Sequence, residues 1–384
     1  MNINIYGSTG EIGKKTLKII SKSFPDIRVN LLCGNTNINL ILKQIKIYKP
    51  NYVHLNDTNA LNKLKKIFKK QLTNKTKILT FNKLKKYLNN SKSDFSVLAI
   101  SGYKSLYYLE NIIKNTSNLG IVNKEAIVSA GHIFKNNKYF KKTNIFPLDS
   151  EHYSLFETLN NGNLKDNLKK IIITASGGPF FGKNFNKLKN VSFKQAINHP
   201  KWKMGYKNSI DSATLVNKCL EIIEAHYLFS IPYEKIDILI HPKALVHSII
   251  EKENYTTQFN LFKNDMIIPL HNFLMLSKIN PKKKYNRLYF KSYSELTFYK
   301  VDPKMFPIIN IFKKMDKSKP SNLIKFNVGN EYAVNMFKNN LIKYTDIYKI
   351  IKKVVSFNLY SSLKTIKDVI KFHEKVENKI KTIF

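Results

Sequence analysis

The stretch IYGSTGEIGKKTL, Ile5–Leu17, joins a short alternating apolar run to an amphipathic, lysine-rich segment through Gly7, Gly10 and Gly13. A glycine turn between a strand and a helix lets backbone N–H groups and the positive end of the helix hold a pyrophosphate. The spacing is GxxGxxG, which is looser than the usual dinucleotide fingerprint, so an ordinary tight strand-to-helix turn is the alternative. The stretch predicts a nucleotide-binding α/β domain.

Outward from this turn, the first third of the chain alternates β-branched runs with lysine-rich amphipathic stretches, the pattern of βαβ units in a parallel sheet. The predicted strands are Asn2–Tyr6, Arg28–Cys33, Tyr52–Leu55, Lys77–Thr80, Phe95–Ser101, Leu119–Val122 and Asn144–Leu148. Open α/β sheets bind ligands beyond the carboxyl ends of their strands. Polar residues that follow these strands are therefore candidates for a site.

The second predicted strand runs into CGNTN, Cys33–Asn37, where a dinucleotide fold would meet the adenosine ribose. No Asp or Glu is present there, which fits a cofactor with a 2′-phosphate, NADPH, better than NADH. No arginine is present to bind that phosphate either. Glu11 lies in the first turn of the predicted helix, where it suits the helix dipole but would repel a phosphate, so we expect its side chain to point away.

The 384 residues, 43% of them apolar, are enough for two or three domains. We expect an α/β fold class with a Rossmann-like dinucleotide-binding domain over 1–148, an α+β catalytic and dimerisation domain over 149–281, a linker over 282–302 and a helical domain over 303–384. The start of the chain does not resemble a signal or transit segment. No apolar run approaches the roughly 18 residues of a membrane span, and two cysteines are too few for a disulfide framework. These features predict a cytoplasmic protein with no membrane partner.

The formal net charge of +39 raises nucleic-acid binding as an alternative function. Only Arg28 and Arg287 are arginines, although arginine is the side chain best suited to bidentate contact with phosphate and guanine. The lysines are spread along the whole chain and collect on no single motif. This distribution favours a tolerated, solvated surface, and we expect no specific nucleic-acid partner.

The hexapeptide PLDSEH, Pro147–His152, is expected to carry a metal site. In an extended segment Asp149 and Glu151 would lie on one side, because side chains alternate with period two, and their oxygens could converge on one hard cation. Two carboxylates this close repel each other unless a metal or a proton sits between them. A solvated loop with scattered acids is the alternative.

A third ligand can come from DSATLVNKCLEIIEA, Asp211–Ala225, which begins with capping residues and continues as an amphipathic helix. Asn217, Lys218 and Glu221 share one face of this helix. A plain surface pair between Lys218 and Glu221 is the alternative, and Glu224 is the rival ligand. Ligation by carboxylates favours Mg²⁺ or Mn²⁺, and the histidines do not show the spacing of a zinc site.

Four further segments carry polar or glycine residues where a substrate could bind. ITASGGPFFG, Ile173–Gly182, ends a predicted strand in a hydroxyl and two glycines, where a phosphate could dock. HPKWKMGYK, His199–Lys207, holds the only tryptophan and suits a lid, with a surface loop as the alternative. NKE, Asn123–Glu125, follows a strand, and HPKALVHS, His241–Ser248, offers two histidines that could equally be core residues.

The ordered set GSTGEIG, NKE, PLDSEH, SGGPF, HPKWKMG, DSATLVNKCLEIIEAH and HPKALVHS closely resembles the 1-deoxy-D-xylulose 5-phosphate reductoisomerase family. The likeness is dense from Asn123 to Ser248 and thinner between Asn35 and Ser93 and over roughly the last hundred residues, where NVGNEYAV, Asn327–Val334, is the landmark. It implies a homodimer that uses NADPH to convert 1-deoxy-D-xylulose 5-phosphate into 2-C-methyl-D-erythritol 4-phosphate, by metal-assisted skeletal rearrangement and then hydride transfer. A dehydrogenase of another phosphorylated metabolite is the alternative enzyme.

The resemblance also implies roles for single residues. Those implied to hold Mg²⁺, Mn²⁺ or Co²⁺ are Asp149, Glu151 and Glu221, and the catalytic set adds Lys124 and His199 to them. The sugar phosphate would contact Lys124, Ser150, Ser176, His199, Trp202, Met204, Ser212, Asn217 and Lys218. The cofactor would contact Gly7, Thr9, Gly10, Glu11, Ile12, Asn35, Thr36, Asn37, Asn123, Glu125 and Gly205. Departures from the family pattern fall at Glu11, Thr36, Lys203 and Cys219.

Overall fold

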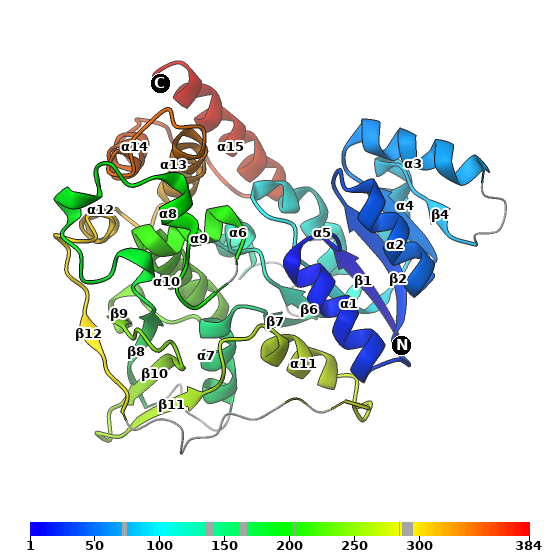
Figure 1. Cartoon of the computed structure of the whole chain (residues 1–384), viewed down its shortest axis with the longest axis horizontal. Helices are drawn as coiled ribbons and strands as arrows, with labels where there is room; N and C mark the ends of the chain where they lie inside the picture. The colour runs from blue at the N-terminus through cyan, green and yellow to red at the C-terminus, as the bar shows by residue number, and fades with distance from the viewer. Residues whose placement is uncertain (71–74, 135–141, 161–166, 203, 284, 286–294) are drawn as a thin grey trace. The chain divides into compact units, whose positions relative to one another are not determined.

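The computed structural model of the protein describes residues 1–70, 75–134, 142–160, 167–202, 204–283, 285 and 295–384 (Figure 1). The chain divides into two compact units. The first unit comprises Met1–Asn123, Asn137–Asp149 and Asp265–Asn286, and the second comprises Lys124–Asn136, Ser150–Asn264 and Arg287–Phe384. The domain boundaries predicted at residues 148, 281 and 302 stay a prediction. Residues 284 and 286–294 of the predicted linker lie outside the described residues.

The first unit is built on a parallel seven-stranded sheet in the order β4-β3-β2-β1-β5-β6-β7. Its strands are β1 (Asn2–Tyr6), β2 (Arg28–Gly34), β3 (Tyr52–Leu55), β4 (Lys77–Ile78), β5 (Ser93–Leu98), β6 (Thr116–Ile121) and β7 (Asn144–Pro147). The seven strands that the sequence predicted are confirmed, with ends that differ by a few residues. The central strands bury many apolar side chains, Ile3, Ile5, Leu31 and Val97 among them, as expected of a sheet covered on both faces.

Several helical elements accompany the sheet of the first unit. They are α1 (Glu11–Ser23), α2 (Ile38–Tyr48), α3 (Thr58–Lys70), α4 (Phe81–Asn90), the 3-10 turn η1 (Tyr103–Ser105), α5 (Leu106–Lys114) and, from a later part of the chain, α11 (Ile267–Met275). Side chains define two of the helix starts, because Asn37 accepts from the Leu40 N–H and Thr80 accepts from the Lys83 N–H. Helix α11 packs against α1, so a distant segment completes this unit.

The glycine turn lies where the strand order of the sheet reverses, between β1 and β5. Gly7 has φ +94°, and a Cβ there would lie 2.4 Å from the carbonyl oxygen of Ala99, which follows β5. A Cβ on Gly13 would lie 2.3 Å from the Gly7 oxygen and 2.5 Å from Cα of Ser8. Only glycine fits at both positions, and the crevice at such a reversal is where open α/β sheets bind nucleotides.

The second unit contains a mixed five-stranded sheet in the order β11-β10-β8-β9-β12. Its strands are β8 (Leu168–Ala175), β9 (Ile236–Ile240), β10 (Val246–Lys252), β11 (Thr257–Leu261) and β12 (Tyr299–Lys300). Strands β8 and β9 are parallel, and the other pairs are antiparallel. The helical elements that accompany this sheet are α6 (Lys124–Phe134), α7 (Ser150–Asn160), η2 (Gly178–Phe180), η3 (Phe185–Leu188), α8 (Phe193–Ile197), α9 (Tyr206–Thr214), α10 (Val216–Phe229) and η4 (Tyr233–Lys235).

The C-terminal part of the second unit is helical, as predicted. It consists of α12 (Ile308–Lys314), α13 (Pro320–Lys338), α14 (Asp346–Val355) and α15 (Ile366–Lys381). Helix α14 buries Ile347, Ile350, Ile351 and Val354 along one face and packs on α13. The predicted fold class, an α/β protein with a Rossmann-like part, an α+β part and a helical part, is confirmed. Among the described helices, none is long and apolar enough to cross a membrane.

The geometry of the glycine turn makes a stability prediction. Gly13→Ala is expected to lower the free energy of unfolding by about 1–3 kcal/mol, the usual cost of forcing a methyl group into a packed site. Gly10→Ala is the matched control, because its Cβ would meet the Gly7 oxygen at 3.4 Å, an ordinary contact distance. Its free energy of unfolding should fall by clearly less than that of Gly13→Ala. Urea denaturation followed by circular dichroism measures both, and equal losses would contradict the packing argument.

Candidate active site

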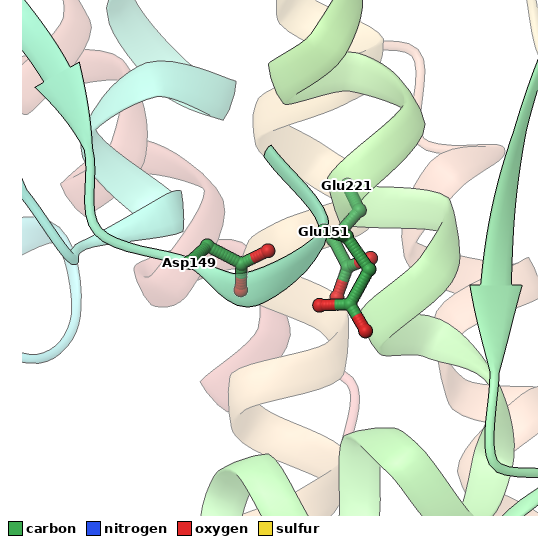
Figure 2. A group of neighbouring side chains, drawn as sticks. All are labelled: Asp149, Glu151 and Glu221. Carbon is green, nitrogen blue, oxygen red and sulfur yellow. The ribbon is translucent and has the colours of Figure 1, made fainter. Parts of the chain in front are cut away.

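Three carboxylates, two from the PLDSEH segment and one from α10, lie close together. Asp149, Glu151 and Glu221 each place one oxygen so that the three oxygens lie within 4.8 Å of one another (Figure 2). Asp149 follows β7, Glu151 stands in the first turn of α7, and Glu221 comes from α10. The sequence prediction that these three side chains meet is therefore matched by the geometry.

The prediction of an extended PLDSEH segment is wrong. Helix α7 begins at Ser150, so Glu151 is a helical residue and Asp149 precedes the helix. Aspartate and serine favour the first positions of a helix because their oxygens accept from its free N–H groups, and this preference overrides the alternation that we expected. Ser150 donates to Glu151 Oε2 at 2.7 Å. The carboxylates converge through the turn between β7 and α7.

Helix α10 positions its ligand through an unusual junction. Helices α9 and α10 are separated only by Leu215, which is buried and has φ +64°. A leucine in the left-handed region is strained, and such strain persists only where the surrounding structure demands it. The junction places Ser212 in the last turn of one helix and Lys218 in the first turn of the next.

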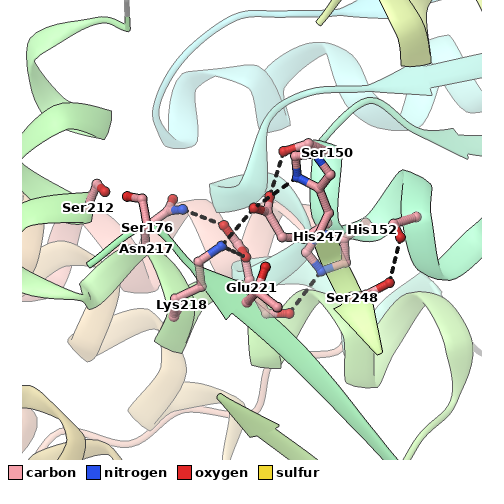
Figure 3. A network of polar contacts seen from close by, with 12 residues as sticks. Ser150, His152, Ser176, Ser212, Asn217, Lys218, Glu221, His247 and Ser248 are labelled. Atoms are coloured by element: carbon pink, nitrogen blue, oxygen red, sulfur yellow. Dashed lines mark hydrogen bonds and ion pairs between the residues drawn. The ribbon is translucent and has the colours of Figure 1, made fainter. Parts of the chain in front are cut away.

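Lys218 ties two of the carboxylates together. Its Nζ lies 2.6 Å from Glu221 Oε2 and 3.1 Å from Glu151 Oε1 (Figure 3). Asn217 Nδ2 donates to Glu221 Oε1. Glu221 has no exposed surface and Lys218 is 6% exposed, so the alternative of a plain surface pair is wrong. A buried arrangement of this kind has to be held in place by its surroundings.

Glu224, the rival ligand, is outside the group of three. Its Oε2 lies 3.5 Å from His152 Nδ1 and 3.9 Å from Lys124 Nζ, and Lys124 Nζ is also 3.6 Å from Glu221 Oε1. The other ring nitrogen of His152 is 2.9 Å from the backbone oxygen of Glu221. Sequence reasoning gave His152 no role, although its place directly after Glu151 was a signal. His152 thus connects α7 to α10 through its contacts with Glu221 and Glu224.

The charges of the cluster suit a divalent cation. Glu151, Glu221 and Glu224 lie within 4 Å of the ammonium groups of Lys124 or Lys218. Asp149 adds a fourth carboxylate beside Glu151 and Glu221, so that acids formally outnumber these lysines by two. Oxygen donors in this number favour a hard cation such as Mg²⁺ or Mn²⁺. The donor set thus fits the metal that the sequence predicted.

A second group of predicted residues meets around His199. Its Nε2 lies 3.0 Å from Ser176 Oγ and 3.1 Å from Ser212 Oγ. Its Nδ1 accepts from the backbone N–H groups of Lys201, at 3.1 Å, and Trp202, at 2.9 Å. Since Nδ1 is an acceptor, the ring is neutral with its proton on Nε2, facing the serines. The structure brings together three residues predicted to bind the substrate.

Burial and nearby charge keep His199 neutral. Burial is the main cause that lowers its pKa to about 4, and the ammonium group of Lys218 lowers it further, while Glu151 opposes both. Near neutral pH the ring is therefore a hydrogen-bond donor at Nε2 and carries no charge. An uncharged donor between two hydroxyl groups can bind a phosphate oxygen through hydrogen bonds, and the charge has to come from Lys218.

His247 is a residue of the site that sequence reasoning left open. Its Nδ1 is 3.7 Å from Glu151 Oε1, and its ring stacks on Phe262 and stands edge-on to Trp202. His241, in contrast, is bound at Nδ1 to the Thr297 carbonyl oxygen and belongs to the core. The two histidines of HPKALVHS thus have different roles. Met204 is half-buried and Gly205 is exposed, and Lys203 lies outside the described residues.

The residues predicted to contact the cofactor near β1 and β2 lie on the loops that follow these strands and in the first turn of α1. Those at the start of α1 are Gly7, Thr9, Gly10, Glu11 and Ile12, and Glu11 is exposed and paired with Lys14, so its carboxylate has a cation beside it. The N-terminus of α1 has no side-chain cap, so its first N–H groups face an open end. Those after β2 are the exposed Asn35, Thr36 and Asn37, the last of which caps α2.

Two other predicted cofactor residues are buried. Asn123 donates through Nδ2 to the carbonyl oxygens of Ile100 and Gly102, at 3.1 Å for the latter, and holds the loop after β5. Glu125 places Oε1 3.1 Å from Lys207 Nζ. The assignments of these residues to the cofactor stay predictions. Because Asn123 Nδ2 and Glu125 Oε1 already have partners within the protein, a cofactor would be bound by the other polar atoms of these two residues.

Comparison with known proteins decides the family. A profile described as 1-deoxy-D-xylulose 5-phosphate reductoisomerase matches residues 3–131, and its C-terminal domain profiles match residues 145–229 and 261–379. A 1-deoxy-D-xylulose 5-phosphate reductoisomerase of Pelagibacter ubique is 37% identical over 369 residues, covering 94% of this chain and 93% of the relative. One from Sulfurihydrogenibium sp. is 36% identical, with 98% and 96% covered.

The chain belongs to the 1-deoxy-D-xylulose 5-phosphate reductoisomerase family. Solved structures agree with this placement. A DOX-P reductoisomerase in complex with NADPH, fosmidomycin and magnesium matches with a TM-score of 0.91 at 27% identity, covering 100% of this chain and 98% of that one. The enzyme from Zymomonas mobilis in complex with NADPH matches with a TM-score of 0.88 at 28% identity and the same coverage. The resemblance drawn from the motifs is confirmed.

The carboxylate cluster of this family member makes a metal-binding prediction. Glu221→Gln should weaken Mn²⁺ binding by about a hundredfold or more, because losing a ligand exceeds the tenfold to hundredfold effect of altering the groups around one. Glu157→Gln, a half-buried acid later on α7, is the control and should bind as the unchanged protein does. Titration calorimetry with Mn²⁺ measures the affinities. Loss of binding in Glu224→Gln with retention in Glu221→Gln would reverse the ligand assignment.

Proposed function

We propose that this protein converts 1-deoxy-D-xylulose 5-phosphate into 2-C-methyl-D-erythritol 4-phosphate, with NADPH as the reductant and a divalent cation as cofactor. The observation that carries the proposal is the convergence of Asp149, Glu151 and Glu221 in a chain that matches the family over nearly its whole length. The substrate is a small phosphorylated molecule. The function makes no use of the high net charge of the chain.

The cation would be held by Asp149, Glu151 and Glu221, and when bound it supplies Lewis-acid stabilisation of negative charge on substrate oxygens. NADPH would lie at the glycine turn of the first unit and supplies the hydride. The turn fits such a cofactor because the lack of a Cβ at Gly7 and Gly13 lets the strand, the turn and the helix pack closely, and no side chain caps the N–H groups at the start of α1.

The side chains around His199 would hold the phosphate of the substrate. Ser176 and Ser212 already lie within hydrogen-bonding distance of His199 Nε2, and Lys218 and Asn217 at the start of α10 add a charge and an amide. A phosphate bound through fixed hydroxyl, imidazole and ammonium donors positions the rest of the sugar toward the carboxylates. Lys218 would serve both groups, because its Nζ also contacts Glu151 and Glu221.

Lys124 and Ser150 would contact the sugar backbone. The ammonium group of Lys124 lies beside Glu221 and Glu224 and its side chain is 11% exposed, so little water competes for it. A positive charge in such a place stabilises negative charge that builds up on neighbouring oxygens during the rearrangement. Trp202 and Met204 would cover the reacting groups and exclude water.

The substrate assay tests this function directly. Incubation of the protein with 1-deoxy-D-xylulose 5-phosphate, NADPH and Mg²⁺ should consume NADPH, which is followed by the absorbance of the reduced nicotinamide. Glu151→Gln should lower kcat by about a hundredfold or more with an unchanged circular dichroism spectrum, because charge stabilisation at the reacting centre is lost. An unchanged protein that leaves NADPH untouched would point to the alternative, a dehydrogenase of another phosphorylated metabolite.

We further propose that the protein is a cytoplasmic homodimer with the domain boundaries given by its sequence, at residues 148, 281 and 302. The five-stranded sheet supports a dimer, since Ile172, Val246 and Ile249 form an apolar cluster on which partly buried side chains, Leu239 and Leu261 among them, are packed. An incompletely covered apolar sheet face is a common place for association. Equilibrium sedimentation should give twice the mass of the chain, and a monomer at micromolar concentration would contradict the proposal.

A further inference from the structure

A second buried charge cluster lies in the same unit, away from the three carboxylates. Lys207, the second residue of α9, places Nζ 2.7 Å from Asp211 Oδ2 and 3.1 Å from Glu125 Oε1. The side chains of Asp211 and Glu125 are 1% and 8% exposed, and that of Lys207 is 18% exposed. Pairing at this depth differs from an ordinary helical pair between residues four apart, which lies in water and contributes only a few tenths of a kcal/mol.

The position of Lys207 in its helix argues that the cluster serves a purpose. A cation in the first turn of a helix opposes the helix dipole, and α9 has no acidic residue there to offset it. Burial lowers the pKa of Lys207, but Asp211 and Glu125 outweigh burial, so that the pKa is raised above its usual value and the charge is kept. A lysine that opposes the dipole of its helix is thus held by Asp211 of the same helix and by Glu125 of α6.

The partners of Lys207 are the sequence neighbours of two residues in the proposed substrate site. Glu125 follows Lys124 on α6, and Asp211 precedes Ser212 on α9. One ammonium group therefore joins the two helices that carry Lys124 and Ser212, residues that lie far apart in the sequence. A displacement of either helix would move a substrate-binding side chain with it.

The cluster extends to α13 through the NVGNEYAV segment, which the proposed function does not use. Asn330 Nδ2 donates to Asp211 Oδ1 at 2.8 Å, so both oxygens of this carboxylate are bound. Glu331 acts on the same lysine and accepts from Asn327 Nδ2 at 3.2 Å. Burial raises the pKa of Glu331 to about 8, against the lowering effect of Lys207. Helices α6, α9 and α13 are thus connected at one point.

The geometry points to Lys207 as a positioning residue for the reaction, which, through Glu125 and Asp211, sets the place of Lys124 relative to Ser212. The inference rests on the proposed function, because it concerns how that site is held. Lys207 acts through its neighbours and is not itself assigned to the substrate. Its removal should change the fit of the sugar phosphate more than that of the nucleotide, because the glycine turn belongs to the first unit and only Glu125 and Gly205 of the predicted cofactor contacts lie near Lys207.

Steady-state kinetics of Lys207→Met test this role. The KM for 1-deoxy-D-xylulose 5-phosphate should rise by about tenfold to a hundredfold, the effect of a small misplacement of positioning groups, while the KM for NADPH should rise by clearly less. If the variant merely contained less folded protein, the apparent kcat would fall and both KM values would stay unchanged. Lys349→Met is the matched control, because Lys349 pairs with Asp346 at 2.8 Å but is 77% exposed, and it should behave as the unchanged protein does.

A triple variant separates positioning from simple neutralisation of buried acids. Lys207→Met combined with Glu125→Gln and Asp211→Asn removes the cation together with both carboxylates that contact it, so the urea midpoint should recover relative to Lys207→Met alone. The raised KM for the sugar phosphate should persist, because the link between the helices is still missing. If Lys207→Met does not fold, the triple variant carries the test. Recovery of the unchanged protein's KM in the triple variant would overturn the inference.

The tryptophan of the chain gives an independent signal. Trp202 is the only tryptophan and belongs to the His199 segment, so its emission reports binding at the substrate site. Titration with fosmidomycin should require about tenfold or more ligand in the Lys207 variants, consistent with the change in KM. If the unchanged protein shows no substrate-dependent NADPH consumption, the proposed function fails. If it is active and the Lys207 variants match it, only the present inference fails.

Discussion

Glu151 and Glu221 hold their carboxylates against the same ammonium group, that of Lys218, in a place where Glu221 has no exposed surface. Taking each of these charges out of water costs several kcal/mol, and the attraction between them offsets that cost only when the geometry is fixed. Helices α7 and α10 therefore cannot shift independently. His152 adds a further link between them through the Glu221 carbonyl oxygen. The architecture of the second unit follows from this constraint.

Backbone conformation provides the precision that these charges require. Leu215 adopts a left-handed conformation between α9 and α10. The end of α9, with Ser212, and the start of α10, with Lys218, are therefore directly joined. In the first unit, Gly7 and Gly13 allow the backbone of the glycine turn to pack so closely that no Cβ would fit at either position. In both units a strained or glycine position is located at the proposed ligand site, and regular elements lie around it. This division suits a protein whose ligands approach the backbone closely.

The excess of lysine has two physical meanings in this protein. Most lysines lie on the surface, where charge is solvated and has little effect on stability. Lys124, Lys207 and Lys218 have side chains that are at most 18% exposed, and each contacts carboxylates from another element. Counting charges cannot separate these three from the others, since burial and partners distinguish them. The net charge therefore says little about function.

By itself the sequence determined the seven strands, the glycine turn, the helical C-terminal part and the acids of PLDSEH, because local periodicity and turn chemistry depend on residues close together in the chain. Only the tertiary structure decided that Glu221 and not Glu224 joins Asp149 and Glu151, that His247 lies beside Glu151, and that Lys207 joins α6 to α9. The expected extended form of PLDSEH was wrong, since α7 begins at Ser150 and Asp and Ser are residues that favour the start of a helix over alternation. Contacts between distant segments depend on how whole helices pack, and no short stretch of sequence encodes that.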